Sequence, residues 1–186
     1  MEIAKYKEFV MRWEGSMGRD TVDSASKYPC PTPFNGKTGW HTVKGVTYAA
    51  WVKVFGKKND ARFFAMNDED WFNVFKTSFW SKVRCSEFSS FSISVLVCEI
   101  AWVCGVGQAP KSLQRAIKKC GKDIVVDGII GNTTIRLANE IEPRILFDAI
   151  QAERERFFKS ISKGKNSKFL KGWLNRVNDA TKMFRP

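Results

Sequence analysis

Apolar residues in the first part of the chain recur three and four positions apart, which is the spacing of one face of a helix. Charged residues such as Lys7, Glu8 and Arg12 fall on the opposite face. The pattern predicts an amphipathic helix that ends at Gly15. The apolar residues of its inner face are Ile3, Tyr6, Phe9, Val10 and Trp13.

Helical spacing returns after residue 45. The segment VTYAAWVKVF predicts a helix capped by Thr47, and a second helix around NDEDWFNVFKTSFWSKV is opened by Asn67 and Asp68. Residues 91–103 are apolar on nearly every face, which is typical of a central helix surrounded by others, although a buried strand shows the same pattern. The length of the run favours the helix.

The last part of the chain continues the helical pattern. After Gly105 and Gly107, the segment KSLQRAIKK predicts a short basic helix and GKDIVVDGIIGNTT a turn-rich element. Asn132 or Thr133 begins the next helix, TIRLANEI. A long helix over residues 147–161 and a terminal helix containing FLKGWLNRV follow, separated by SKGKNSK. Together these elements predict a mainly α fold.

A long irregular segment interrupts this helical pattern between residues 16 and 45. It is rich in Gly, Pro, Ser, Thr and Asp and contains the run DSASKYPCPTPFNGKTG, which has strong turn chemistry. Loops of this length are usually functional or disordered. The segment is therefore the first place to look for a site.

Positive charge dominates the composition. The chain has 31 Lys and Arg against 19 Asp and Glu, a net charge of +12, and its sequence pI is near 9.6. Such a field favours a polyanionic partner. Nucleic acid, an anionic membrane surface and the acidic bacterial wall all fit, and charge alone does not choose among them.

The five cysteines form no CxxC pair and none of the usual zinc spacings, so we expect no metal site and no cofactor. Their odd number and scattered placing indicate reduced thiols, mostly buried, in a protein made in a reducing cytoplasm. The N-terminus lacks the pattern of a signal peptide. The most apolar stretch, residues 93–106, is interrupted by Glu99 and is too short to span a bilayer, so we expect a soluble protein without a membrane span.

Glu14 lies at the end of the first predicted helix, directly before Gly15 and facing the long polar segment. The negative end of the helix dipole and partial burial beside Trp13 both disfavour an ionised carboxylate. A carboxylic acid that keeps its proton can serve as the general acid in glycoside cleavage. Most glutamates at helix ends are merely solvated, so the position alone does not establish this role.

The segments FVMRWEGSMGRD and HTVKGVTYAAW resemble the start of glycoside hydrolase family 108, the bacterial and phage N-acetylmuramidases. In that family the first helix ends in Glu-Gly-Gly, and the resemblance implies that Glu14 is catalytic. Ser16 replaces the second glycine and Met17 replaces an aromatic residue. The family's Thr-x-x-Gly-[Ile/Val]-Thr motif is kept as Thr42, Gly45, Val46 and Thr47.

Glycoside hydrolysis usually needs a second carboxylate across the scissile bond. The resemblance implies an aspartate between the two motifs, and Asp20 is the first candidate and Asp23 the second. Thr42 is a candidate to position water or substrate. We assign Asp23, Trp40, Gly45 and Thr47 to substrate binding, with Trp40 stacking on a sugar ring. Turn, capping and loop-pinning roles explain these residues equally well.

The segment CEIAWVCGVGQAPKSLQRAI resembles the family's central helix and the Leu-Gln pair that follows, here Leu113 and Gln114. Glu99 and Val103 replace residues that are commonly Asp and Asn in the family. We expect Glu99 to be a partnered polar residue in a crowded helix rather than a catalyst.

The segments VDGIIGNTT and FLKGWLNRV resemble the predicted peptidoglycan-binding module of the same proteins. Their glycines and Trp173 also have a simple structural explanation as turns and an apolar anchor. The resemblance implies a lysozyme-like catalytic domain over residues 1–119 and a small helical module over residues 120–186, packed as one compact unit.

We therefore expect a peptidoglycan hydrolase of the lysozyme type that uses Glu14 as its acid. The partner is bacterial peptidoglycan, reached after release by a holin-type pore or a dedicated system, and we expect a monomer. The alternatives are an inactive wall-binding or secretion-associated scaffold, allowed by the changes at Ser16, Met17 and Val103, and a basic nucleic-acid-binding protein. His41, the single histidine, is interpreted as a loop residue. Retaining or inverting stereochemistry is left open.

Overall fold

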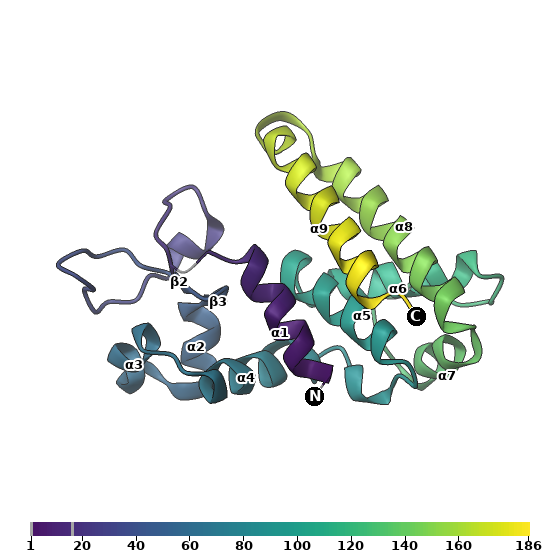
Figure 1. Ribbon diagram of the computed structural model, residues 1–186, viewed down its shortest axis with the longest axis horizontal. Helices are drawn as coiled ribbons and strands as arrows, with labels where there is room; N and C mark the ends of the chain where they lie inside the picture. Colours follow the sequence, from purple (N-terminus) through teal and green to yellow (C-terminus); the bar gives the residue numbers. More distant parts are fainter. Residues whose placement is uncertain (1, 16) are drawn as a thin grey trace. The chain divides into compact units, whose positions relative to one another are not determined.

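The computed structural model describes residues 2–15 and 17–186, and the chain divides into two compact units, Met1–Ser78 and Phe79–Pro186. Most of the described residues are helical, which confirms the prediction of a mainly α fold. Figure 1 shows the order of the elements along the chain. Each unit has its own buried core and is described by itself.

In the described part of the first unit, four helices surround an aromatic core. Tyr6 and Phe9 lie on the buried face of the first helix, as the spacing predicts, and the Trp71 and Phe75 rings stack with centroids 5.1 Å apart. The predicted caps are confirmed for two of the helices, because the side chains of Thr47 and Asn67 accept hydrogen bonds from the first turns that follow them. The helices are α1 (Glu2–Trp13), α2 (Tyr48–Phe55), α3 (Asp60–Phe64) and α4 (Asp68–Phe75), with 3₁₀ turns at Ser24–Lys27 and Lys57–Asn59.

A small antiparallel sheet, absent from the sequence prediction, joins α1 to α2. Its strands are β1 (Met17–Gly18), β2 (Thr42–Val43) and β3 (Val46–Thr47), in the order β1-β2-β3. Two-residue strands are too short to show alternation, which is why the pattern gave no sign of them. The 23 residues between β1 and β2, residues 19–41, make up most of the irregular segment, which is held at its base by the pairing of Gly18 with Thr42.

The hairpin between β2 and β3 turns through Lys44 and Gly45. Both residues have positive φ, 48° and 76°, which is the backbone of the tight two-residue turn that matches strand twist. Two hydrogen bonds fix the turn to the unit's core: the Trp71 Nε1–H donates to the Lys44 carbonyl at 3.1 Å, and Lys44 Nζ donates to the Met66 carbonyl at 2.7 Å. The hairpin is therefore a rigid part of the first unit.

The second unit is a helical bundle around α5. Nine consecutive residues of α5, from 93 to 101, are buried, which confirms a central helix at this position rather than a strand. Helices α6, α8 and α9 pack against it, and α8 and α9 run side by side as a long hairpin (Figure 1). The helices are α5 (Phe91–Cys104), α6 (Gln108–Lys119), α7 (Asn132–Glu140), α8 (Pro143–Ile161) and α9 (Leu170–Phe184), with 3₁₀ turns at Cys85–Glu87 and Gly164–Phe169; a π-helical turn covers Lys76–Trp80.

Glu99 confirms its expected structural role inside this bundle. Its fully buried carboxylate accepts from Arg176 Nε at 2.6 Å on α9 and from Arg154 Nη2 at 3.2 Å on α8. Arg154 also donates to Gln151, whose amide nitrogen donates to the Val177 carbonyl. A buried carboxylate between two guanidiniums is costly to desolvate, but it ties three helices together because no member can leave without stranding a charge.

All five cysteines are free thiols; Cys30, Cys85 and Cys98 are buried, which confirms the prediction of mostly buried, reduced side chains. Burial raises the pKa of the Cys104 thiol to about 11. None of the described helices is long and apolar enough to cross a membrane.

Candidate functional site

Glu14 directly follows α1 and leads toward the small sheet. Its N–H donates to the Val10 carbonyl at 2.9 Å, so the residue continues the last helical turn, and its side chain is half-buried. Three residues further on, β1 begins at Met17. The Ser16 position, where the sequence departs from the family pattern, lies outside the described residues. Glu14 thus lies at the end of the first helix, as the sequence predicts, and its orientation toward the irregular segment stays a prediction.

His41 connects two of the expected site residues. Its side chain is 1% exposed, and it lies immediately before β2. Nε2 lies 3.1 Å from the backbone carbonyl oxygen of Asp20, and Nδ1 lies 2.8 Å from Oγ1 of Thr42. Two backbone hydrogen bonds, from its N–H to the Gly18 carbonyl and from the Tyr48 N–H to its carbonyl, fix the residue itself.

The partners of His41 determine its tautomer when the ring is neutral. A carbonyl oxygen only accepts, so Nε2 carries the proton and donates to Asp20. Nδ1 then accepts, and the hydroxyl proton of Thr42 points at the imidazole. The hydroxyl lone pairs of Thr42 are left to accept from a water molecule or a substrate hydroxyl. The sequence interpretation of His41 as a simple loop residue missed this link, because a single histidine in a loop makes no pattern.

The two candidate aspartates have exposed side chains with local partners. Oδ1 of Asp20 accepts from the Val22 N–H at 2.9 Å, and Oδ1 of Asp23 accepts from the Ala25 N–H at 2.9 Å. These are turn and capping bonds, the second of them at the start of the 3₁₀ turn Ser24–Lys27. Each aspartate keeps a second carboxylate oxygen beyond the one used in its turn, and Asp20 alone of the two is tied to His41.

Trp40 pins the base of the irregular segment. Its indole N–H donates to the Phe34 carbonyl at 3.3 Å, and its own carbonyl accepts from the Cys30 N–H at 2.7 Å. The Arg19 guanidinium lies 5.5 Å from the ring centroid. The arrangement matches the loop-pinning explanation, and Arg19 lies where a stacked sugar would have to compete with it.

Gly45 shapes the turn of the hairpin, and Thr47 caps the helix that follows. Gly45 supplies the second positive φ of the turn, and Thr47 Oγ1 accepts from the Ala50 N–H at 3.2 Å as the N-cap of α2. Thr47 also pairs with Thr42 across the hairpin. The motif from Thr42 to Thr47 thus places the Thr42 hydroxyl on a strand whose register is fixed at both ends.

The first unit also has an open cavity of about 690 Å³ between the irregular segment and α2. Aromatic and proline rings from Tyr28, Pro29, Pro31 and Tyr48 line it, and Lys27, Lys53 and Lys57 add positive charge. Aromatic faces and lysines suit a ligand that combines sugar rings with carboxylates. Glu14 is not among the residues that line this cavity.

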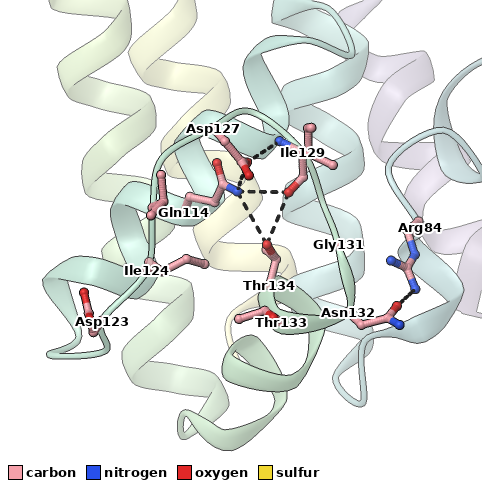
Figure 2. A pocket seen from close by; sticks show the side chains of 11 residues that line it. Arg84, Gln114, Asp123, Ile124, Asp127, Ile129, Gly131, Asn132, Thr133 and Thr134 are labelled. Carbon is pink, nitrogen blue, oxygen red and sulfur yellow. Dashed lines mark hydrogen bonds between the residues drawn. The ribbon is translucent and has the colours of Figure 1, made fainter.

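The second unit has a different cavity, of about 590 Å³, between α6 and the start of α7 (Figure 2). The buried amide of Gln114 organises it: Nε2 donates to Asp127 Oδ1 at 2.7 Å and to the Ile129 carbonyl at 2.9 Å, and Oε1 accepts from the Gly128 N–H at 2.9 Å. The bonds from Gln114 and the Ile129 N–H hold the pKa of Asp127 below its usual range. The sequence pattern pointed to Gln114 and to the turn at residues 127–131 separately, but gave no sign that one builds the other.

Within the described residues, no group of three or more His, Cys, Asp or Glu side chains could hold a metal ion. The candidate groups that the first unit brings together are carboxylates, a hydroxyl and an imidazole. These are the groups that proton transfer and water activation require.

Two family models match the chain. Residues 7–105 match Glycosyl hydrolase 108, and residues 108–178 match the Predicted Peptidoglycan domain. Nine chains of solved structures match the fold. One of them, the structure of Brucella abortus SagA, aligns with a TM-score of 0.72 and 21% identity, over 98% of this chain and 95% of that chain. No curated protein sequence matches the chain.

The fold and the two matches define a glycoside hydrolase of the lysozyme type that acts on peptidoglycan. The chain belongs to the family Glycosyl hydrolase 108, which covers more than half of its length. The resemblance found in the sequence is thereby confirmed for both the hydrolase and the peptidoglycan module.

Proposed function

We propose that the protein is an N-acetylmuramidase that cleaves the glycan strand of peptidoglycan with Glu14 as general acid. The observation that carries the proposal is the position of Glu14, half-buried at the end of α1 inside the region that matches the hydrolase family. From there the chain enters β1, whose Gly18 pairs with Thr42. The pairing supports the proposal, because it ties the segment that follows Glu14 to the strand that carries the Thr42 hydroxyl.

The proposed roles of Glu14 and Asp20 follow the family resemblance, and those of Thr42 and His41 rest on the hydrogen bonds of His41. Glu14 protonates the glycosidic oxygen as the bond breaks. Asp20 is the second carboxylate, and it either stabilises the developing positive charge or activates water. Thr42 accepts a hydrogen bond from that water or from a substrate hydroxyl. His41 is a positioning residue, since it holds the Asp20 backbone and the Thr42 hydroxyl in one register.

The basic surface favours the same partner. A net charge of +12 attracts the carboxylate-rich wall, and this attraction is lost as salt screens it. We propose that the protein acts at the wall as a monomer, after synthesis in the bacterial cytoplasm and release by a holin-type pore or a dedicated system. Asp23 and Trp40 remain proposed as contacts of the glycan beside the irregular segment.

The test of the proposed bond specificity is product analysis. Purified peptidoglycan is digested with the wild-type protein, and the new reducing ends are reduced with borohydride and identified by mass spectrometry. The proposal predicts reduced N-acetylmuramic acid at the new ends. Reduced N-acetylglucosamine would identify a glucosaminidase instead, and intact glycan with bound protein would identify a wall-binding scaffold without turnover.

A further inference from the structure

The cavity of the second unit combines exposed apolar side chains with carboxylates. Val125 and Ile129 line it and are 76% and 65% exposed, although both are large apolar residues. Apolar groups that stay in water beside a concave polar surface are typical of a binding site. The Gln114 hydrogen bonds and the positive φ of Gly128 fix the turn that carries Ile129, so the surface is preformed.

The charges of the cavity differ from those of the unit around it. Residues 79–186 carry 19 Lys and Arg and 10 Asp and Glu, a net charge of +9. Most of these acidic residues form ion pairs with basic side chains, but among the ion pairs of the described residues none includes Asp123 or Asp127. Both line the cavity, which is therefore a local negative site on a positive unit.

Arg84, the one basic residue of the lining, already has partners for its guanidinium. Arg84 forms an ion pair with Glu87 and donates to the Ile130 carbonyl at 2.9 Å and to Asn132 Oδ1 at 2.8 Å. Asp123 and Arg84 lie at opposite ends of the site in Figure 2, so Arg84 does not cancel the charge of Asp123. Among the lining residues, the charge left for a ligand is that of the two carboxylates, and the side chain of Lys111 packs against Gly128 beside the cavity.

The composition of the lining favours a peptide over a sugar as the ligand. None of its residues is aromatic, so it lacks the flat face on which a sugar ring stacks. It offers branched and methyl-bearing side chains instead, from Ile124, Val125, Ile129, Thr133 and Thr134. Such a surface fits a short peptide with methyl side chains and a free amine. The peptide stem of peptidoglycan has this chemistry, because it contains alanines and a diamino acid.

We propose that this cavity binds the peptide stem of peptidoglycan, with the free amine of its diamino acid at Asp123 and Asp127 and an alanine methyl group against Val125 and Ile129. The proposal rests on the proposed function, because it gives the wall substrate of the first unit a second contact on the second unit. It assigns a ligand and named contacts to a region that matches only a predicted peptidoglycan domain.

The test uses the full chain, the free tetrapeptide stem as the probe, and insoluble peptidoglycan with and without its peptides. The double variant Val125→Ser/Ile129→Ser removes the apolar contacts. Ile145→Ser is the matched control, since Ile145 is an exposed residue of α8, 58% exposed and outside the cavity. Wild type and control are expected to bind intact wall and the free tetrapeptide, and the double variant is expected to bind both about tenfold more weakly.

The variant Asp123→Asn distinguishes specific binding of the amine from a general electrostatic attraction. It makes a basic protein more basic, so a purely electrostatic attraction to the wall would strengthen. The proposal predicts weaker binding of the tetrapeptide, by about three- to tenfold, because an ammonium group loses its carboxylate. Equal binding of the tetrapeptide by wild type, double variant and Asp123→Asn, or equal binding to intact and peptide-free wall, overturns the proposal.

The two proposals fail separately in this design. Glu14→Gln is expected to abolish cleavage and to bind the tetrapeptide as wild type does. Cavity variants are expected to keep cleavage of short, peptide-free glycan fragments. If the cavity variants lose tetrapeptide binding but still cleave the fragments, the proposed ligand of the cavity is supported. If Glu14→Gln still cleaves the fragments, Glu14 is not the acid, and the proposal for the cavity is unaffected.

Discussion

The two units of this chain differ in net charge and in where their candidate functional groups lie. Residues 1–78 carry 12 Lys and Arg against 9 Asp and Glu, a net charge of +3, whereas residues 79–186 hold +9 of the total. In the first unit the candidate chemistry lies on a helix end, a short hairpin and an irregular segment. In the second, charged side chains are buried as structural ties or line a cavity.

This difference suggests that the catalytic groups lie on loops of the first unit and that the helical bundle of the second unit provides a binding surface. Loops on a rigid scaffold suit reacting groups, because they bring residues far apart in sequence together and can be shaped independently of the core. A helical bundle held by buried ion pairs gives a stable surface for binding. The predictions that follow test whether catalysis belongs to the first unit and stability and wall contact to the second.

The largest effect is expected for Glu14→Gln. The variant removes the proposed general acid, so the rate of wall cleavage is expected to fall by about 10²–10⁴-fold, and the fold is expected to stay unchanged because Gln has the same shape. The measurement is the rate of turbidity loss of a peptidoglycan suspension. Glu8→Gln, on the exposed face of the same helix, is the matched control and is expected to cleave at the wild-type rate. Equal rates for the two variants would exclude Glu14 as the acid.

The next effect is on stability. Glu99→Gln leaves Arg154 and Arg176 buried without their carboxylate and is expected to lower the free energy of unfolding by about 3–5 kcal/mol. Urea denaturation followed by circular dichroism measures it. The control Glu155→Gln removes a surface ion pair with Lys159 and is expected to cost less than about 1 kcal/mol. A loss of similar size in both variants would contradict a special role for the buried network.

A smaller effect on catalysis is expected at Thr42. Thr42→Val keeps the shape but removes the hydroxyl that His41 orients, and we expect kcat to fall about 10- to 100-fold with KM nearly unchanged. Thr42→Ser restores the hydroxyl and most of the rate, which a purely structural role in β2 does not predict. Steady-state kinetics on soluble glycan fragments separates kcat from KM. Equal rates for the Val and Ser variants would show that the hydroxyl takes no part.

The smallest effect is a dependence of stability on pH at Glu153. Burial acts to raise the pKa of this carboxyl, but hydrogen bonds and ion pairs with Arg156 and Lys119 outweigh it and hold the pKa below the ordinary value of 4.5. Because the folded pKa is the lower one, the stabilisation is present above the ordinary glutamate range and is lost as pH falls through the folded pKa.

Glu153→Gln is therefore expected to lower the free energy of unfolding by about 1 kcal/mol at pH 7, and the gap between wild type and variant closes as the pH falls below 4.5. Denaturation curves collected between pH 7 and pH 3 measure the gap. A gap that stays constant over this range would show that the ion pairs of Glu153 do not stabilise the fold.

The longer helices could be predicted from the sequence because each repeats its apolar positions over two or more turns. Helix α3, with five residues, was not predicted, because it is too short to show a period. Glu99 could also be predicted as a partnered residue, since an ionised group in a fully apolar helix needs partners, although its two arginines lie 55 and 77 residues away and left no local signal. The sheet could not be predicted, because strands of two residues have no period. Helix α7 begins at Asn132, one of the two predicted starts. The residue before it, Gly131, has no side chain to cap the helix, so no capping signal in the sequence marked this start.

The site was predicted less completely, for a physical reason. Glu14 and the motif from Thr42 to Thr47 are local in sequence and carry the family resemblance. The link between Asp20 and Thr42 depends on a buried histidine whose bonds span 21 residues. The cavity of the second unit depends on an amide that reaches 13 to 15 residues along the chain. Contacts of this kind appear only once the chain is folded.

The most direct test of the account measures retention and cleavage together on one preparation of insoluble peptidoglycan, with the wild type beside Glu14→Gln. Protein bound to the pellet reports wall contact, and muropeptides released to the supernatant report hydrolysis. The account predicts that both proteins are retained equally and that only the wild type releases muropeptides. Release of muropeptides by Glu14→Gln at the wild-type rate would contradict it.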